Sequence, residues 1–463
     1  MPTDDDENIA LAETTESVDQ LNKAFYEKYP YPWPPLKFDY LLDRDLGVVL
    51  LNQNIGDWKH NTVPKDPIIW VAGCGANQAI FTALRFPRAT VLGTDLSTTS
   101  LDRSATIVND LHIPNLVLRE ESIHHAGYRD QFDYIICTGV IHHNANPRAA
   151  LAKLAAALKP TGVLELMVHN RFHRTAYAAF QKAVRTLCGS GATPDYDTEL
   201  SIARKLIQLG SKYSILSSLF PHYNDYPQSL LADALIQPVE YSFTIESLQT
   251  AAANCGLELL TPYVSDFDAI EQRESWNIDF KDDQLQQSYE SLDDALRWQI
   301  TNLLLLEKSP LLWFYLQRQD SSRPRKSEKH ISEEFLDTVF SRIDTVQRSY
   351  ALTDAGIYVQ AAKSVPFPVA RPREAVAEII ALSDGNRSIR EIFRQLAVQT
   401  PFSTVNRLRV QLTTSAFPYL KAVNSGENRN TDIHKRLDHL ALRSIKPTTV
   451  RVPYFVSTTT GEE

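Results

Sequence analysis

The stretch "IIWVAGCGAN", residues 68–77, decides which fold this sequence can adopt. Its apolar run leads into Gly73-Cys74-Gly75, a pattern that predicts a buried β-strand ending in a tight turn. A helical stretch follows and stops at Pro87, and "TVLGTDLS" (90–97) predicts a second strand. A strand, a helix and a strand at this spacing predict a parallel βαβ unit.

The same alternation continues along the chain. Apolar runs predict three further strands, at 116–122, 132–143 and 162–170. Helices are predicted between them, at 98–113 and 147–160. We therefore expect an α/β fold with an open, doubly wound Rossmann-like sheet, completed by a helix between Thr244 and Gly256 and a strand after it. Helical insertions are expected over 171–240, and a long helical pair over 284–319.

Composition divides the chain into segments. They are an acidic, disordered N-terminus (1–19), an aromatic, proline-rich lid (20–65), the sheet domain (66–265), a helical connector and linker (266–330), a small α-rich domain (331–425) and a loose tail (426–463). Proline in the lid favours extended geometry, so the lid either packs on the next domain or covers a ligand pocket. The basic stretch "SSRPRKSEKH" (321–330) is expected to be a solvated linker.

Charge and cysteine usage exclude several classes of function. The net charge of −9 at pH 7 weighs against broad nucleic-acid binding, which depends on Lys and Arg. No run of ~18 apolar residues occurs, so no membrane span is expected. The four cysteines show no C-x-x-C spacing, so we expect no structural zinc site and mark no other metal site. Cys74 and Cys137 lie in strand-like contexts, which indicates buried, reduced thiols in the cytoplasm.

The turn after the first strand is the candidate cofactor site. Gly73 and Gly75 allow a close approach of the backbone to a ligand. Asp95 follows about twenty residues on, at the end of the second strand, where a carboxylate can accept both hydroxyls of a ribose. The sequence G-C-G-A-N-Q lacks the spacing G-x-G-x-x-G, so a ligand with an amino-acid moiety fits better than a dinucleotide. Asn77 is expected to adopt left-handed geometry or to cap the next helix.

Four motifs in order, "WVAGCGANQA", "GTDLS", "FDYIICTGVIHH" and "LKPTGVLELMV", resemble the class I S-adenosylmethionine-dependent methyltransferases. The resemblance covers about residues 66–170 and extends loosely to 265. It implies S-adenosylmethionine as cofactor, with Gly73, Cys74 and Gly75 beneath the methionine part. It also implies that Asp95 holds the ribose and that Leu96 packs on the adenine. Further cofactor contacts are implied for Asn77, which stands where many members carry glycine, and for Glu121, Ser122, Ile123, Thr138, Gly139 and Val140.

Histidines beyond the predicted strands are candidates for catalysis. Methyl transfer from a sulfonium is an in-line displacement, so positioning is the main contribution of the protein. His142 and His143 follow the fourth strand, where they could accept a proton or simply order the loop. His169, Asn170 and Arg171 follow the fifth strand, where they contact substrate or satisfy a helix start. Aromatic residues expected to close over the site are Tyr26, Tyr29, Tyr31, Trp33, Tyr223 and Tyr226.

We therefore expect a methyltransferase that acts on an N or O nucleophile of a peptide, protein or small molecule. The alternatives are a non-catalytic scaffold that binds the cofactor, and a nicotinamide-dependent oxidoreductase, which the missing glycine disfavours. The segment "AVAEIIALSDGNRSIREIFRQLA" resembles winged-helix-like units appended to some protein- or peptide-modifying enzymes. Substrate docking, dimerisation or stability is its expected role, because three arginines in an acidic chain do not favour DNA binding.

Overall fold

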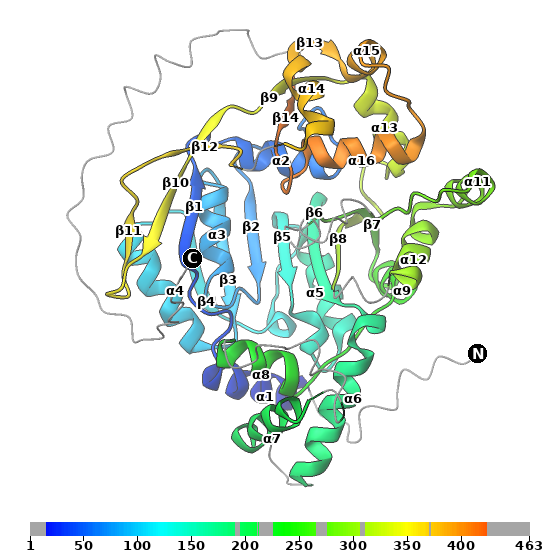
Figure 1. Ribbon diagram of the computed structural model, residues 1–463. Helices are drawn as coiled ribbons and strands as arrows, with labels where there is room; N and C mark the ends of the chain where they lie inside the picture. Colours follow the sequence, from blue (N-terminus) through cyan, green and yellow to red (C-terminus); the bar gives the residue numbers. More distant parts are fainter. Residues whose placement is uncertain are drawn as a thin grey trace.

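A computed structural model describes residues 15–189, 195–210, 212, 226–264, 276–305, 311–369 and 372–423. A seven-stranded sheet with the order β4-β3-β2-β5-β6-β8-β7 forms its centre (Figure 1). The strands are β2 (Ile68–Ala72), β3 (Thr90–Asp95), β4 (Leu116–Glu120), β5 (Phe132–Thr138), β6 (Leu158–His169), β7 (Leu257–Pro262) and β8 (Leu311–Arg318). Strands β2 to β6 pair in parallel, which confirms the predicted Rossmann-like sheet.

Helices cover both faces of this sheet. Alternate residues of β2 enter opposite cores: Trp70 and Ala72 face one, Ile69 and Val71 the other. This two-sided burial is what a parallel strand requires. The Trp70 face packs against α5 (Pro147–Ala157), α9 (Ile245–Asn254) and α12 (Asp294–Leu304), and the Ile69 face against α2 (Leu46–Asn54), α3 (Gln78–Arg85) and α4 (Thr98–Leu111).

The predicted helical pair over 284–319 is wrong in its second half. Helices α11 (Asp283–Glu290) and α12 occupy the first half, but "LLWFYLQR" (311–318) forms β8. This strand lies between β6 and β7 and runs antiparallel to both. A short apolar run buried on both faces carries no period that separates strand from helix, which explains the error.

The carboxyl edge of the sheet is covered by helices. Strands β3 and β4 lie on one side of β2 in the sheet, and β5 and β6 lie on the other side. The strand order therefore reverses next to β2, and open α/β sheets bind ligands at such a switch point. An apolar cluster joins α1 (Thr15–Lys28), α6 (Arg171–Cys188), α7 (Tyr196–Gln208) and α8 (Gln228–Ile236) below that edge in Figure 1. The prediction of disorder is therefore wrong for residues 15–19, which begin α1; residues 1–14 lie outside the described residues.

Within the predicted lid (20–65), residues 29–36 form neither helix nor strand. This segment continues into β1 (Lys37–Leu41), which pairs with β10 (Thr345–Leu352) from the far end of the sequence. Strands β11 (Tyr358–Gln360) and β12 (Val365–Phe367) also pair with β10. The N-terminal and C-terminal segments thus share one antiparallel sheet.

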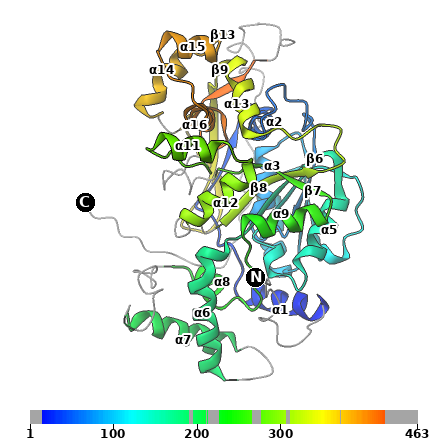
Figure 2. The same ribbon diagram turned by 90° about the vertical axis from the view of Figure 1, so that its right-hand side faces the viewer.

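The C-terminal unit contains strands as well as helices. Sheet β13-β9-β14 packs with four helices around a core of its own, at the end of the molecule opposite α1 and α6–α8 (Figure 2). The unit is thus mixed rather than α-rich as predicted, and a winged-helix fold stays a prediction. Its elements are α13 (Glu328–Asp337), β9 (Val339–Arg342), α14 (Glu374–Leu382), β13 (Asp384–Ser388), α15 (Ile389–Gln395), α16 (Phe402–Thr413) and β14 (Leu420–Ala422). The expected tail, 426–463, lies outside the described residues.

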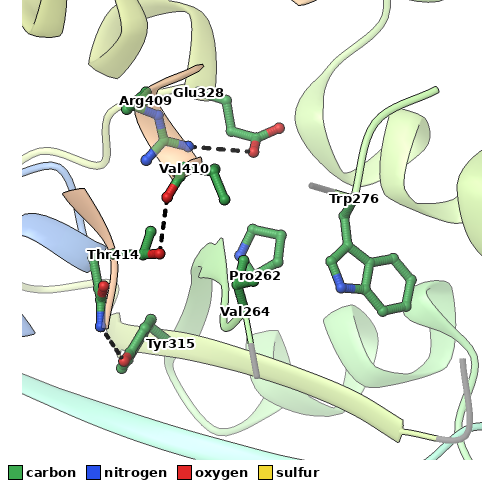
Figure 3. A pocket seen from close by; sticks show the side chains of 9 residues that line it. Pro262, Val264, Trp276, Tyr315, Glu328, Arg409, Val410 and Thr414 are labelled. Carbon is green, nitrogen blue, oxygen red and sulfur yellow. Dashed lines mark hydrogen bonds and ion pairs between the residues drawn. The ribbon is translucent and has the colours of Figure 1, made fainter. Parts of the chain in front are cut away.

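The basic stretch 321–330 is not a solvated linker. Arg325 donates a hydrogen bond to the Leu259 carbonyl at 2.6 Å and pairs with Asp294 at 2.6 Å. Glu328 is only 2% exposed. Figure 3 shows Glu328 beside Arg409 at a small pocket where the C-terminal unit meets β7 and β8. The stretch therefore anchors the C-terminal unit, since Arg325 and Glu328 have buried partners that the sequence does not reveal.

Candidate active site

The turn after β2 has the shape that its two glycines predict. Gly73 and Gly75 have φ values of 71° and 53°, in the left-handed region that side chains disfavour. A Cβ on Gly73 would lie 2.4 Å from Cγ2 of Val140. The N–H groups of Gly73 and Cys74 both donate to the Thr94 carbonyl, at 2.8 and 2.9 Å. The turn is therefore fixed against β3 and against the segment after β5.

The Asp95 carboxylate joins the turn to the loop after β3. One oxygen accepts from the Gly75 N–H at 2.7 Å, and the other accepts from the Ser97 N–H at 2.9 Å. Burial raises the pKa of Asp95 above its usual range, against hydrogen bonds that lower it. Each oxygen retains acceptor capacity, so the carboxylate fits the predicted ribose contact. Half-buried Leu96 follows it.

Asn77 occupies the N-cap position of α3, as one expectation had it, but not in the expected way. Its φ is −136°, outside the left-handed region, and its side chain makes no capping hydrogen bond to α3. Instead, Nδ2 donates to the Trp33 carbonyl at 2.8 Å. A Cβ on Gly75 would lie 2.7 Å from the Tyr31 carbonyl oxygen. The segment 29–36 therefore lies directly on the glycine turn, which agrees with the prediction of a lid.

The other predicted cofactor residues divide into two groups. Gly139 and Val140 are in positions that fit a cofactor contact, and Val140 packs against Gly73 of the turn. Other side chains have partners of their own or face inward. Cys74 and Ile123 are buried in the two sheet cores, so only their backbone can meet a ligand. The side-chain hydrogen bonds pair Thr138 with Gln78, Glu121 with Tyr128, and Ser122 with Asp19 of α1.

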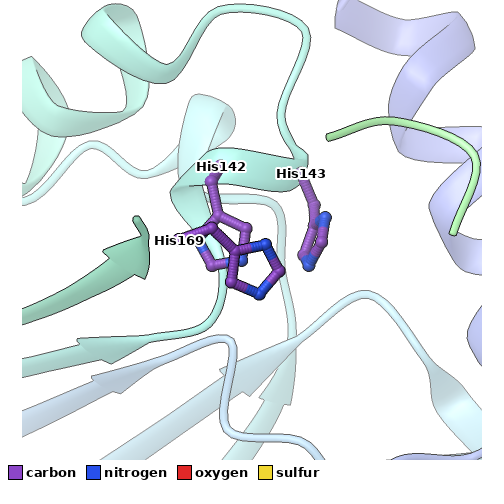
Figure 4. A group of neighbouring side chains, drawn as sticks. All are labelled: His142, His143 and His169. Atoms are coloured by element: carbon purple, nitrogen blue, oxygen red, sulfur yellow. The ribbon is translucent and has the colours of Figure 1, made fainter. Parts of the chain in front are cut away.

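Three histidines that follow β5 and end β6 gather in one group (Figure 4). His142 and His143 belong to a 3₁₀ turn, η2 (Ile141–His143), two residues beyond the Val140 that contacts Gly73. His169 ends β6, and its ring centroid lies 3.9 Å from that of His142. His142 is 0% exposed, and neither of its ring nitrogens has a hydrogen-bond partner among the described residues. A fully buried imidazole with two open nitrogens is an unusual arrangement.

The segment between α8 and α9 holds these histidines in place. The Tyr241 and Phe243 N–H groups donate to the carbonyls of His142 and His169, at 2.7 and 2.9 Å. Burial lowers the pKa of His143 to about 3 and that of His142 well below its usual range. Both imidazoles are therefore unprotonated at neutral pH. Whether either accepts a proton from a substrate stays a prediction.

An ion pair that the sequence did not indicate stands behind the histidines. Arg174 donates to Glu240 through Nε, at 2.5 Å, and through Nη2. Arg174 is 7% exposed, so this ion pair is buried. Burial raises the pKa of Glu240, but His169 and Arg174 lower it further, so that the net shift is downward. No sequence motif indicates the role of Glu240, because its partner Arg174 lies 66 residues away in the sequence.

Two of the residues after β6 make hydrogen bonds that order the start of α6, and a contact of either with substrate stays a prediction. Asn170 is 0% exposed; its Oδ1 accepts from the Phe172 N–H at 3.2 Å and its Nδ2 donates to Asn302 at 2.7 Å. Arg171 donates to the Ser242 carbonyl at 3.1 Å. Their side chains therefore order α6 and the adjoining segment.

The predicted aromatic residues do not all face the turn. Tyr31 and Trp33 contact each other edge to face, at 6.1 Å between centroids, in the segment that covers Gly75. Tyr26 donates to Asp233 of α8 at 3.0 Å. Tyr29 is buried among α1, α6 and α7, and Tyr226 packs against the same cluster, so neither covers the turn. Tyr223 lies outside the described residues.

Comparison with known proteins identifies the class. Residues 70–164 match the model of a family described as a methyltransferase domain. With the seven-stranded sheet, this match shows that the chain carries a class I S-adenosylmethionine-dependent methyltransferase domain. S-adenosylmethionine is its cofactor, and the oxidoreductase alternative is wrong. In the described part of the chain, no helix combines the length and apolarity needed to cross a membrane.

Two relatives extend the comparison beyond this domain. An uncharacterised protein of Synechococcus sp. is 24% identical over 313 residues, which are 64% of this chain and 70% of the relative. The structure of PKMT2 from Rickettsia typhi, in complex with AdoHcy, is similar with a TM-score of 0.51 and 16% identity. That similarity covers 85% of this chain and 78% of PKMT2, so the shared fold extends past the matched domain.

Proposed function

We propose that the protein transfers a methyl group from S-adenosylmethionine to a nitrogen or oxygen atom of a peptide, protein or small-molecule acceptor. One observation carries the proposal: the segment 138–143 connects the cofactor turn to the group of histidines. Val140 contacts Gly73, and His142 follows two residues later. Cofactor and acceptor would therefore meet across this short segment.

The residues around the turn fit the cofactor. When bound, S-adenosylmethionine supplies a methyl group on a sulfonium, a good leaving group. Gly73 and Gly75 leave a cradle that any side chain would fill. Asp95 accepts the ribose hydroxyls, while Tyr31 and Trp33 exclude water from above. The chain of PKMT2 binds AdoHcy in the same fold, which supports this assignment.

The acceptor side is polar and enclosed. The polar groups come from η2 and the end of β6 (the three histidines), from the segment between α8 and α9 (Glu240), and from α1 and α8 (the pair Tyr26–Asp233). Such groups can orient a nitrogen or oxygen nucleophile against the methyl carbon, which is where in-line transfer gains most. A scaffold that only binds the cofactor has no need for buried polar groups here.

Calorimetry followed by transfer of labelled methyl groups tests the proposal. S-adenosylmethionine and S-adenosylhomocysteine should bind to the purified protein, and NAD should not. Incubation of methyl-labelled cofactor with fractionated cell extract should then label an acceptor, whose modified atom mass spectrometry identifies. Cofactor binding without any transfer would support the scaffold alternative, and absence of binding would overturn the proposal.

A further inference from the structure

We propose that His142, His143 and His169 bind a divalent transition-metal cation of the zinc class. Among the described residues, these three form a group whose side-chain ligand atoms all lie within 4.8 Å of one another. The inference goes beyond methyl transfer and does not rest on the proposed function. Only a role of the metal in methyl transfer to an acceptor would depend on the proposed function.

The three ligand atoms must move closer together to hold a cation. Nitrogen ligands lie at about 2.1 Å from zinc, so two ligands of a tetrahedral site are ~3.4 Å apart. The ligand atoms of the cluster lie within 4.8 Å of one another, up to ~1.4 Å farther apart than this. His142 is placed between the other two rings, at centroid distances of 4.2 Å from His143 and 3.9 Å from His169. Rotation of the His142 ring, which no hydrogen bond restrains, would bring a ligand atom toward a shared centre.

Two of the three rings have a carbonyl or carboxylate oxygen beside Nδ1. Nδ1 of His143 lies 2.8 Å from the Val239 carbonyl, which accepts only from a protonated nitrogen. Nδ1 of His169 lies 3.1 Å from the Glu240 carboxylate. The His143 contact places the proton of that ring on Nδ1 and leaves its Nε2 lone pair free, and the Glu240 carboxylate lies within ion-pair distance of His169. Proteins usually orient a metal-bound histidine by a hydrogen bond from its other ring nitrogen to a carbonyl or a carboxylate.

The charge around the cluster also suits a cation. Glu240 and Asp233 interact electrostatically with His169, and Arg174 interacts with both carboxylates. Two carboxylates therefore face one guanidinium in this enclosed region. A divalent cation held by neutral imidazoles would compensate the negative charge, as oppositely charged partners do in buried sites.

The donor set indicates which metal would bind. Three imidazoles without a thiolate suit Zn²⁺ and the neighbouring divalent ions. Three protein ligands leave one position open, as in zinc sites that bind water or a substrate atom. In this protein the open position would lie beside the turn that holds the cofactor, so an acceptor oxygen or nitrogen could occupy it.

Direct metal binding tests the inference without reference to activity. The full-length protein is treated with a chelator, and Zn²⁺ is then titrated in competition with a chromophoric chelator. Elemental analysis should give one equivalent of zinc, and Co²⁺ should give the intense visible absorption of a four-coordinate site. His142→Ala and His169→Ala should each weaken binding by at least ~10-fold. His330→Ala, which removes a histidine that is 59% exposed on α13, should bind like the unaltered protein.

Each outcome decides the question. Substoichiometric zinc in the unaltered protein, or full affinity in a folded His142→Ala His169→Ala double variant, would overturn the inference. Circular dichroism shows whether the variants fold, and His142→Asn provides a polar replacement if alanine does not. If no variant folds, X-ray absorption of the zinc-loaded unaltered protein must show three imidazole ligands. Calorimetry with S-adenosylmethionine on the metal-free protein separates this result from the proposed function.

Discussion

The two glycines after β2 are needed for different contacts. Gly73 lies against Val140 of the segment after β5, whereas Gly75 lies against the Tyr31 carbonyl of the segment that covers the turn. Both also have positive φ. A side chain at either position would therefore meet a neighbour and strain the backbone at the same time.

Gly73→Ala should lower the free energy of unfolding by about 1–3 kcal/mol, because the added methyl group overpacks Val140 at a positive φ. Cofactor binding should weaken as well, since the turn must shift. Gly127→Ala is the matched control, because a Cβ there meets no atom within 4 Å. Urea unfolding followed by circular dichroism measures both variants. Equal stability of the two would show that the turn tolerates a side chain.

Asp95→Asn should weaken binding of S-adenosylmethionine by ~5–150-fold, equivalent to about 1–3 kcal/mol for lost hydrogen bonds to a charged group. The amide retains the size of the carboxylate but accepts through one atom only, while Gly75, Ser97 and the ribose all donate. Calorimetry measures the affinity. Asp102→Asn, an exposed change one turn into α4, should leave it unaltered. An unchanged affinity in Asp95→Asn would remove the ribose assignment.

The segment 29–36 is an element held at both ends. Before it, Asn22 of α1 donates to the His143 carbonyl at 2.7 Å. After it, β1 pairs with β10 of the C-terminal part. Between these anchors, Asn77 holds the Trp33 carbonyl. The segment therefore depends on contacts from three separate parts of the chain.

Asn77→Asp should loosen this segment without weakening α3. Aspartate is as good an N-cap residue as asparagine, but its carboxylate cannot donate to the Trp33 carbonyl and repels it. Amide hydrogen–deuterium exchange at Tyr31 and Trp33, followed by mass spectrometry, should therefore be faster than in the unaltered protein. Asn109→Asp makes the same change on the exposed face of α4 and should not alter the rate. Protection of the segment in Asn77→Asp would contradict the role of this contact.

The loop after α2 predicts a pH dependence of stability. Burial raises the pKa of Asp57, but hydrogen bonds from Thr62, Asn61 and Lys59 lower it further, and the net shift is downward. A carboxyl group with a lowered folded-state pKa stabilises the protein above its unfolded pKa of about 3.9. That stabilisation is lost as the pH falls through the folded-state value.

Asp57→Asn should therefore be destabilised most at neutral pH, by about 1–3 kcal/mol, because the donors lose a charged acceptor. The difference from the unaltered protein should shrink as the pH falls below about 4, where the carboxyl is protonated in the unfolded chain, and should vanish below the lower pKa of Asp57 in the folded protein. Urea unfolding over a series of pH values measures this difference. A difference in the free energy of unfolding that stays constant down to acidic pH would show that the ionisation of Asp57 is not coupled to folding.

At the scale of the whole molecule, a buried charged network joins the C-terminal unit to the sheet domain. Glu328 of α13 accepts from Trp298 at 3.0 Å and Asn277 at 2.9 Å, and pairs with Arg297 at 3.4 Å. Asn406 of α16 donates to the same carboxylate at 3.4 Å. Removal of one partner from such a network leaves other polar groups buried without compensation.

Glu328→Gln should therefore lower the free energy of unfolding by about 3–5 kcal/mol. Glu333→Gln is the control on the same helix, because Glu333 is 67% exposed and pairs with Arg390 at the surface. Its effect should stay within about 1 kcal/mol. Thermal and urea unfolding compare the two variants. Similar stabilities would mean that the C-terminal unit is held by its apolar contacts alone.

Local patterns in the sequence were sufficient for the sheet and for the cofactor turn. The turn residues Gly73 and Gly75, and Asp95 at the end of β3, follow from the order of strands and helices, since each depends on its near neighbours. The sequence also placed His142, His143 and His169 at the correct edge. It did not place β8, because an apolar run without alternation fits a helix or a strand equally well.

Contacts between distant residues were decided only by the tertiary structure. Asn77 binds the lid rather than capping its helix, and Glu240 stands behind His169, although no pattern links these residues. The same is true of the three histidines as a group, since 26 residues separate His143 from His169. The physical reason is that hydrophobic periodicity and turn chemistry act over a few residues, whereas hydrogen bonds and charge pairs require only proximity in space. The sequence therefore determined the fold and its ligand edge, and the folded chain determined what surrounds each reactive group.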